Sequence, residues 1–458
     1  MATAEPRRRA RAARTALLTA AERPPHRHHA HPPPHLADAA ALRDLLDRAA
    51  VQPVFQPIVD LTTGGTRAYE ALARGPRGHL LETPEALFGA ARASGLLPAL
   101  DANCVAAALE SARAGGLRWP WTLFINIEPD SHSIDVLPAL AGAASAPIVV
   151  ELTERALADD PAEVLATVAL IRRLGWGVAL DDVGVNPDSL ALLPLIAPDV
   201  IKLDASMVQL RPSAHTAHVF SAVAAEVERS GCLVVAEGIE TPAHLHAARA
   251  LGAHLGQGWL FGRPGRLPAE SADPAIDPLP LCRAGRDGID STPFTAASRG
   301  REVRASTKPL LLAMSKHIEQ QAVAIGESCL VLTTFQTASA FVPAARRYAE
   351  LATHNAYVAV FGSGLEAHPV PGVRGVDLLP HEPLSREWSL VIVGPHYAAV
   401  LAAKLIDDDG GGGDTHWNYV LSHERKVVVR AAATLMNRIT RDCAPPSPSG
   451  TEASHPAR

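Results

Sequence analysis

Residues 51–264 show a repeating pattern in which short apolar runs are closed or interrupted by one or two polar residues. Apolar runs of this length, rich in valine, isoleucine and leucine, are typical of buried parallel strands. Longer stretches with helical spacing of the apolar residues lie between them. The polar residues in question are Glu70, Asn126, Glu151, Asp181, Asp182, Lys202 and Glu237.

The spacing of these polar residues predicts a closed barrel of alternating strands and helices. The intervals from position 70 to 126, 151, 181, 202 and 237 are 56, 25, 30, 21 and 35 residues. One strand–helix unit needs roughly 30 residues, so most intervals should hold one unit and the first should hold two. The carboxyl ends of the strands of such a barrel converge on one face, where its active sites lie. We therefore expect an α/β fold, a modified (β/α)8 TIM-type barrel, with its chemistry at that face.

The beginning of the barrel carries a different signal. Two strands, at about Val51–Asp60 and Arg67–Leu72, are joined by the sequence Thr62-Thr-Gly-Gly65. A Gly-Gly turn between two apolar runs indicates a hairpin, so the first strand is predicted to be antiparallel. A helix is expected just before it, over Asp38–Ala50, where the leucines share one side.

A chain of 458 residues is too long for a single core. Prolines concentrated between residues 264 and 300 indicate an extended linker, and a second, smaller α/β domain is expected after it. Its predicted strands are Cys329–Leu332, Ala356–Phe361 and Leu390–Val393, and its predicted helices are Pro309–Gly326 and Ala338–Thr353. The expected organisation is a disordered basic and His-Pro tail (1–35), the barrel (36–265), the linker (266–302), the second domain (303–440) and a disordered tail (441–458).

Composition narrows the class of protein. A net charge of −6 argues against a general nucleic-acid binder, so neither DNA nor RNA is expected as a partner. No stretch of 18 apolar residues occurs, and no membrane span is expected. The five cysteines are odd in number, scattered and without a CxxC motif, which favours reduced thiols and a cytoplasmic location.

The residue types at the barrel face favour a metal-dependent phosphodiesterase. Several carboxylates around one opening repel one another unless cations lie between them, and oxygen ligands suit Mg²⁺ or Mn²⁺. Two such ions can lower the pKa of a water molecule and neutralise charge on a phosphate. A lysine beside that water favours hydroxide, and a nearby carboxylate can accept the proton. Arg74 can donate two hydrogen bonds to a phosphate.

These residues belong to an ordered series of motifs that extends over about 210 residues. The series comprises Phe55-Gln-Pro-Ile-Val-Asp60, Glu70-Ala-Leu-Ala-Arg74, Asn126, Glu151-Leu-Thr-Glu154, Asp181-Asp182, Lys202-Leu-Asp204, Ala236-Glu-Gly-Ile-Glu240, Gly256-Gln-Gly258 and Phe261-Gly-Arg-Pro264. It resembles a known family, the EAL-domain cyclic di-GMP phosphodiesterases, which takes its name from the motif that begins at Glu70. The barrel of that family also has an antiparallel first strand.

The resemblance implies a role for each of these residues in opening cyclic di-GMP to linear pGpG. Glu70, Asn126, Glu151 and Asp181 would hold one metal ion, with Asp181 shared and Asp182 on a second. Lys202 would touch the attacking water, and Glu237 would be the general base or its metal-side partner. The residues that would contact guanine or phosphate are Gln56, Arg74 and Gln257. Three further acidic residues would contact the metal ligands and not the metal itself, and they are Glu154, Glu240 and Asp204.

One loop departs from the family pattern. After the aspartate pair the family usually has Phe-Gly-x-Gly-x-Ser-Ser-Leu, whereas this chain has Val183-Gly-Val-Asn-Pro-Asp-Ser-Leu190. Asp188 is the main change, because in the family this loop meets the glutamate that corresponds to Glu154, and two carboxylates would repel. The family's loop also couples metal binding, substrate binding and dimerisation. A weak or inactive domain acting as a cyclic di-GMP receptor, or as a protein-interaction module, is therefore the alternative, and a homodimer is one expected assembly.

Two stretches of the second domain carry a further resemblance. They are Val391-Ile-Val-Gly-Pro-His396 and Trp417-Asn-Tyr-Val-Leu-Ser-His423. They are similar to the DICT domain, a sensory module found with cyclic di-GMP enzymes and two-component proteins. The resemblance implies a bacterial signal-transduction protein whose second domain senses an unknown signal or ligand. His396, Trp417 and His423 either line a sensor pocket or serve in packing and capping, and the sequence leaves both alternatives open.

Overall fold

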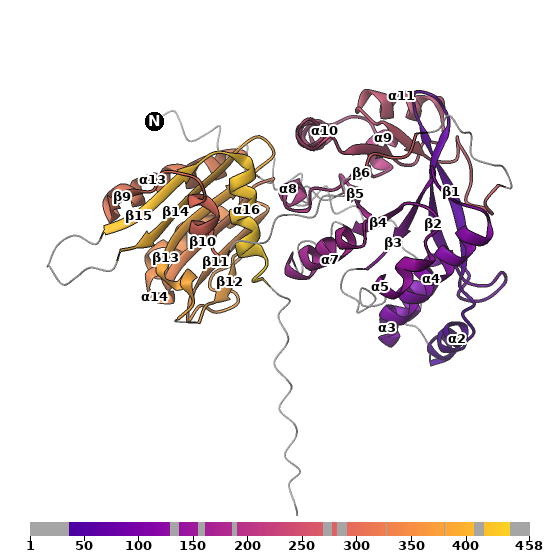
Figure 1. The fold of residues 1–458 in the computed structure, drawn as a ribbon, viewed down its shortest axis with the longest axis horizontal. Helices are drawn as coiled ribbons and strands as arrows, with labels where there is room; N and C mark the ends of the chain where they lie inside the picture. Colours follow the sequence, from indigo (N-terminus) through magenta and orange to yellow (C-terminus); the bar gives the residue numbers. More distant parts are fainter. Residues whose placement is uncertain are drawn as a thin grey trace, which may run out of the picture. The chain divides into compact units, whose positions relative to one another are not determined.

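The computed structural model describes residues 36–128, 137–153, 161–185, 190–268, 277–281, 291–326, 328–379, 381–406 and 416–439 (Figure 1). The chain divides into two compact units, one within residues 1–51 and 74–100 and the other within residues 52–73 and 101–458. Both predicted tails, residues 154–160, which include Glu154, and residues 186–189 lie outside the described residues.

The smaller unit contains α2 (Leu36–Asp47) and α3 (Pro84–Ser94), which pack against each other. The sequence sets both ends of α3. Thr83 accepts a hydrogen bond from the backbone N–H of Ala86, and Pro84 fits the first helical position, where no N–H partner is needed. Gly95 ends the helix in the left-handed region, at φ 67°.

The larger unit contains a closed barrel, which confirms the predicted fold class. Its strands are β1 (Gln52–Asp60), β2 (Thr66–Arg74), β3 (Thr122–Asn126), β4 (Ile148–Thr153), β5 (Gly177–Val183), β6 (Val200–Leu203), β7 (Leu233–Ala236) and β8 (Leu255–Gln257). Neighbouring strands from β2 to β8 are parallel, and β1 pairs antiparallel with β8, Ile58 opposite Gln257. The predicted antiparallel first strand is thereby confirmed.

Helices connect the parallel strands. They are α4 (Leu97–Ala114), α5 (Leu137–Leu140) with the 3₁₀ turn η2 (Ala141–Ala143), α7 (Pro161–Arg173), α8 (Leu193–Ile196), α9 (Ser206–Gln209), α10 (Ala214–Ser230) and α11 (Pro242–Ala250). The prediction of two strand–helix units between Glu70 and Asn126 is wrong. This segment contains two helices, α3 and α4, and β2 is followed directly by β3 in the barrel. Its length comes from the second helix and not from another strand.

The C-terminal part of the chain forms a mixed sheet in the order β12-β11-β10-β13-β14-β15-β9. Its strands are β9 (Arg304–Thr307), β10 (Leu330–Thr337), β11 (Tyr357–Ser363), β12 (Arg374–Asp377), β13 (Glu387–Val393), β14 (Ala398–Leu405) and β15 (His416–Ser422). The three predicted strands correspond to β10, β11 and β13. The pairs β10–β11 and β11–β12 are parallel, whereas β10–β13, β13–β14, β14–β15 and β15–β9 are antiparallel.

Helices accompany this sheet, and two of them differ from the prediction. They are α12 (Pro293–Ser298), α13 (Lys308–Ile325), α14 (Ala338–Phe341), η4 (Val342–Ala344), α15 (Ala345–Ala352), η5 (Pro383–Arg386) and α16 (Arg425–Met436). The helix expected over residues 338–353 is interrupted by η4, where Pro343 cannot donate a helical hydrogen bond. Inside the predicted linker, α12 buries Ala296 and Ala297 and packs on α16, because small side chains allow close approach. None of the helices in the described parts of the chain combines the length and the apolar character that crossing a membrane requires.

Glu387, the first residue of β13, is hydrogen-bonded to α12. Its side chain should make the stability of this region depend on pH. Its side chain is buried and accepts the Phe294 N–H at 3.1 Å. Burial raises the pKa of Glu387 to about 7. A carboxyl with a raised folded pKa favours the folded state while protonated, so its contribution should be full below about pH 4.5 and be lost as the pH rises through 7. We expect Glu387→Gln, which keeps an acceptor for Phe294, to raise the local unfolding free energy at pH 8 by about 1–3 kcal/mol.

Hydrogen exchange of β13 and β14 amides at pH 6 and pH 8 would measure the effect of Glu387→Gln. Glu366→Gln is the control, because Glu366 is exposed. A Glu387→Gln protein that opens as easily as the unmodified protein at pH 8 would contradict the expected cost of the buried charge.

Candidate active site

The barrel interior contains a layer of apolar side chains to which every strand contributes one residue. Each of these residues is at most 2% exposed. They are Ile58, Ala68, Phe124, Val149, Ala179, Val200, Val235 and Leu255, in the order β1 to β8. This layer closes the barrel beneath the carboxyl ends of the parallel strands.

The candidate site residues form the next layer, because side chains alternate along a strand and every second residue faces the same way. Two positions beyond the apolar layer on β2 to β8, the residues are Glu70, Asn126, Glu151, Asp181, Lys202, Glu237 and Gln257. On β1, which runs in the opposite direction, the equivalent position is two residues earlier and is Gln56. The strand register therefore directs eight polar side chains into one opening.

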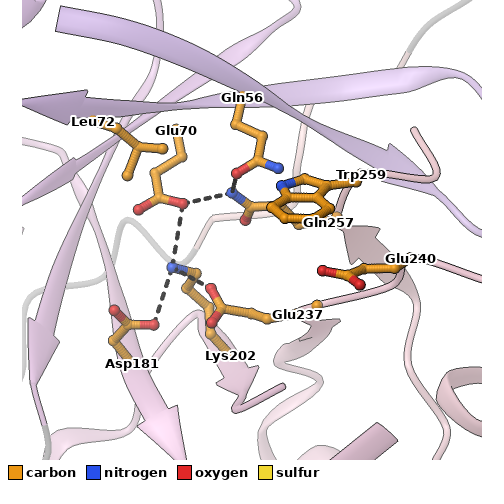
Figure 2. A pocket seen from close by; sticks show the side chains of 11 residues that line it. Gln56, Glu70, Leu72, Asp181, Lys202, Glu237, Glu240, Gln257 and Trp259 are labelled. Atoms are coloured by element: carbon orange, nitrogen blue, oxygen red, sulfur yellow. Dashed lines mark hydrogen bonds and ion pairs between the residues drawn. The ribbon is translucent and has the colours of Figure 1, made fainter. Parts of the chain in front are cut away.

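Lys202 is the central cation of this layer. Its side chain is 1% exposed, and its Nζ lies 2.8 Å from Glu151 Oε1 and 2.8 Å from Glu237 Oε1. Asp181 Oδ1 is 3.0 Å away and Glu70 Oε2 is 3.6 Å away. Figure 2 shows Glu70, Asp181 and Glu237 directed at the ammonium group. One ammonium thus faces four carboxylates, which leaves a surplus of negative charge.

The pKa values of the acids reflect this surplus. Burial raises the pKa of Glu151 well above its ordinary value, and neighbouring Glu70 raises it further. Burial also raises the pKa of Glu237 to about 7 and, together with Asp181, that of Asp182 to about 6. Burial also favours neutral Glu70, yet Lys202 and a hydrogen bond from Gln257 hold its pKa below the ordinary value. The pKa of Lys202 is raised despite burial, principally by Glu151 and Glu237.

The donor set fits divalent metal ions. Both carboxylate oxygens of Glu151 and Oδ1 of Asp181 are buried and lack a hydrogen-bond partner among the described residues. Ion pairs with Lys202 neutralise part of the negative charge of these carboxylates. Asp181, Asp182 and Glu237 each offer an oxygen within 4.8 Å of the others. Mg²⁺ and Mn²⁺ prefer carboxylate and amide oxygens, so additional cations would satisfy this cluster.

A chain of amides fixes the orientation of Glu70. Asn126 Nδ2 donates to Glu70 Oε1 at 3.1 Å, and Gln257 Nε2 donates to Glu70 Oε2 at 2.6 Å. Gln257 Nε2 also donates to Gln56 Oε1 at 3.0 Å, and Gln56 Nε2 donates to the Gly262 carbonyl at 3.2 Å. Gln257 Oε1 is buried and lacks a hydrogen-bond donor within the described part of the chain.

Asp182, near the end of β5, has an uncommon backbone conformation, and a turn follows it at Gly184. Asp182 has φ 56° and Gly184 has φ 113°. A Cβ at Gly184 would lie 2.8 Å from Met207 Sδ, so this position requires glycine. A non-glycine residue in the left-handed region costs about 1–3 kcal/mol and needs support from its surroundings. His215 Nε2 donates to the Gly184 carbonyl at 2.7 Å and supplies part of that support.

The site opens into a pocket of about 280 Å³. Its lining residues are Gln56, Glu70, Leu72, Asp181, Lys202, Glu237, Gly238, Glu240, Gln257, Gly258 and Trp259. Leu72, Gly238, Gly258 and Trp259 were not predicted as site residues. Strand alternation could not have identified Trp259, because β8 ends at Gln257 and Trp259 lies in the turn that follows.

The remaining predicted residues lie at different distances from the chemistry. Glu240 lines the pocket. Asp204 accepts the Ser206 N–H at 2.9 Å near the start of α9, and its charge contributes to raising the pKa of Asp182. Arg74 is the last residue of β2 and does not line the described pocket, so its contact with substrate stays a prediction.

In the C-terminal sheet, two of the three sensor candidates make packing contacts. Trp417 is buried and lies edge-to-face with Trp388 at 6.0 Å. His423 Nδ1 donates to the Ala398 carbonyl at 3.1 Å, and its ring lies against Tyr397. These contacts agree with the packing alternative for Trp417 and His423.

Two segments of the chain match known domain families. Residues 39–264 match the model of the EAL domain. This part of the chain is an EAL domain. Residues 295–405 match the DICT domain, described as a sensory domain in diguanylate cyclases and two-component systems. The EAL match covers every residue of the inward-facing polar layer, and the DICT match begins within α12 and ends at the end of β14.

Relatives of the EAL domain occur in several bacteria. An uncharacterized protein of Azorhizobium caulinodans is 32% identical over 241 residues, covering 49% of this chain and 33% of that protein. The cyclic di-GMP phosphodiesterase NbdA of Pseudomonas aeruginosa is 31% identical over 235 residues, covering 49% of this chain and 30% of NbdA. The solved PaMucR phosphodiesterase–c-di-GMP complex is 26% identical with a TM-score of 0.45, covering 50% of this chain and 98% of that one. The chain thus spans about a third of the length of these two curated relatives.

Proposed function

We propose that the EAL domain is a metal-dependent phosphodiesterase that hydrolyses cyclic di-GMP to linear pGpG. The observation that supports this most is the inward-facing polar layer, in which buried Lys202 contacts four carboxylates next to a pair of glutamines. Such a surplus of buried oxygen ligands is suited to binding cations and a phosphate between them. Relatives about 30% identical over the EAL domain are named cyclic di-GMP phosphodiesterases.

The residues that would hold Mg²⁺ or Mn²⁺, as two ions, are Glu70, Asn126, Glu151, Asp181 and Asp182. Bound divalent ions would lower the pKa of a water molecule and neutralise charge on the phosphate. The hydrogen bonds from Asn126 and Gln257 keep the Glu70 carboxylate facing the opening. Asp182 lies near the end of β5, two residues before the Gly184 carbonyl to which His215 donates.

In this mechanism Lys202 and Glu237 act on the attacking water. The ammonium of Lys202 favours the deprotonated form of a nearby water by electrostatic attraction. Glu237 lines the pocket, lies 2.8 Å from Lys202 and is suited to accept the water's proton. The water oxygen then bonds to phosphorus, one bond from phosphorus to a ribose oxygen breaks, and solvent protonates the departing oxygen. Gln56 and Gln257 would hold the guanine or phosphate groups, together with Arg74.

The proposal extends to the whole chain in three respects. The DICT domain would regulate the phosphodiesterase in response to a signal or ligand, in keeping with the sensory description of its family. The free thiols of Cys104, Cys232 and Cys329 agree with a cytoplasmic, reducing environment. A homodimer is the assembly that the resemblance implies.

The test is hydrolysis of cyclic di-GMP by the purified full chain with Mn²⁺ and with Mg²⁺, beside a Glu70→Ala control. We expect pGpG with either ion, and loss of product with chelator or in the control protein. Absence of product from the unmodified protein would overturn the proposed activity. A binding titration would then separate a cyclic di-GMP receptor, which binds without turnover, from a protein-interaction module, which does not bind.

A further inference from the structure

Glu237 lies one residue beyond the end of a strand, on a glycine turn. β7 ends at Ala236, and the side chain of Glu237 is 21% exposed at the pocket. The next residue, Gly238, has φ 62°, in the left-handed region that favours glycine. Because glycine adds backbone freedom, a carboxylate on such a turn keeps one orientation only if neighbouring groups hold the turn.

The segment formed by β6 and α9 contacts this turn at two points. Lys202, on β6, has its Nζ 2.8 Å from Glu237 Oε1, and Figure 2 shows the carboxylate directed at that ammonium group. Gln209, the last residue of α9, donates from its Nε2 to the Gly238 carbonyl at 2.8 Å. One contact therefore holds the carboxylate of Glu237, and the other holds the backbone that follows it.

The side chain of Gln209 fits closely against the glycine. A Cβ at Gly238 would lie 2.7 Å from Gln209 Nε2 and 2.5 Å from the Cβ of Ala205, so the amide occupies the space that the missing side chain leaves. Gln209 itself is exposed, so burial of its side chain in a core does not account for this contact. The close fit instead indicates that the amide has a role at this turn.

The turn is also held by backbone hydrogen bonds to both neighbouring strands. The Glu237 N–H donates to the Leu203 carbonyl at 3.1 Å, and the Ile239 N–H donates to the Gln257 carbonyl at 3.0 Å. These two bonds hold the N–H groups on either side of Gly238. The bond from Gln209 holds the carbonyl between them, and a substitution can remove it without changing the backbone.

We propose that Gln209 is a positioning residue for the phosphodiesterase reaction, because its amide holds the turn that orients Glu237 as the proton acceptor. This inference rests on the proposed function. Gln209 does not line the described pocket, so it acts through Glu237 and not by touching substrate. Its effect therefore belongs to the chemical step and not to substrate binding.

Gln209→Met tests this role, because methionine has a similar length and no N–H donor. With Mn²⁺, its kcat for cyclic di-GMP should fall roughly 3- to 10-fold, the equivalent of one net hydrogen bond, while KM stays close to that of the unmodified protein. Gln209→Lys, which again supplies a donor, should recover part of the loss. Gln320→Met is the matched control, because Gln320 is exposed on α13, and it should keep the unmodified kcat.

A double-mutant cycle separates positioning of Glu237 from a general structural role. In a Glu237→Gln background no proton acceptor remains to be oriented, so Gln209→Met should reduce the residual kcat by a much smaller factor than in the unmodified background. Equal factors in the two backgrounds, or a Gln209→Met protein as active as Gln320→Met, would overturn the positioning role alone. Absence of hydrolysis by the unmodified protein would overturn the proposed function, and the positioning role with it.

Discussion

Replacing Lys202 by methionine is expected to abolish turnover and to destabilise the metal-free protein more than any other single change in the site. The side chain is similar in length but removes the only ammonium that contacts Glu70, Glu151, Asp181 and Glu237 among the described residues. Removing one partner of a buried ion pair typically costs about 3–5 kcal/mol, because the remaining charge is left uncompensated. We expect a loss of that order in chelator, measured by denaturant unfolding.

The pH dependence of this loss has a definite sign. Without Lys202 the buried carboxylates keep their protons to higher pH than in the unfolded chain. Groups with raised folded pKa values stabilise below their unfolded pKa and cease to do so as the pH rises. The Lys202→Met protein should therefore be closer in stability to the unmodified protein at pH 5 than at pH 8. Mn²⁺ should recover much of its stability, since a cation would replace the lost charge.

Lys316→Met is the matched control, because Lys316 is exposed on α13. It should leave both stability and turnover close to those of the unmodified protein. If Lys202→Met unfolds in chelator at the same denaturant concentration as Lys316→Met, Lys202 is not needed to neutralise the buried charge of the four carboxylates. The electrostatic account of the site would then be wrong.

Glu237→Gln is expected to lower kcat by roughly 10²- to 10⁴-fold, the usual range for removal of a general acid–base group. The amide keeps the shape of the side chain and an oxygen for Lys202, but it cannot accept a proton from water. Binding of cyclic di-GMP should be retained, so the loss should appear in kcat and not in KM. Steady-state hydrolysis with Mn²⁺ gives both parameters.

Glu240→Gln tests whether the position of the carboxylate matters, because Glu240 lines the same pocket from the same segment. Within the described residues Lys202 pairs with Glu237 and not with Glu240. Glu240→Gln should therefore reduce kcat far less than Glu237→Gln. A Glu240→Gln protein that loses as much activity as Glu237→Gln, or more, would move the general base to Glu240.

Much of the fold could be predicted from local sequence patterns. The apolar runs ended by polar residues marked β2 to β7, and the Gly64-Gly65 turn marked the antiparallel entry of β1. The predictions were wrong where a local feature of the sequence did not match the structure that the segment forms in the folded protein. Segment length alone suggested an extra strand before Asn126, where a second helix lies. Proline content alone suggested extended chain at residues 293–298, where tertiary packing of Ala296 and Ala297 supports α12.

What the sequence determined by itself is the set of polar residues and their spacing from the apolar layer of the barrel. Side chains two residues apart on a strand face the same side. Because Phe124 and Val200 face the barrel interior, Asn126 and Lys202 face it too. What only the tertiary structure decided is which of these side chains meet. Contacts such as Lys202 with Glu70, and Gln257 with Gln56, join strands far apart in the chain. They exist because closing the barrel brings β1 beside β8. The spacing of the polar residues predicted a closed barrel, but it did not predict which side chains make contact inside it.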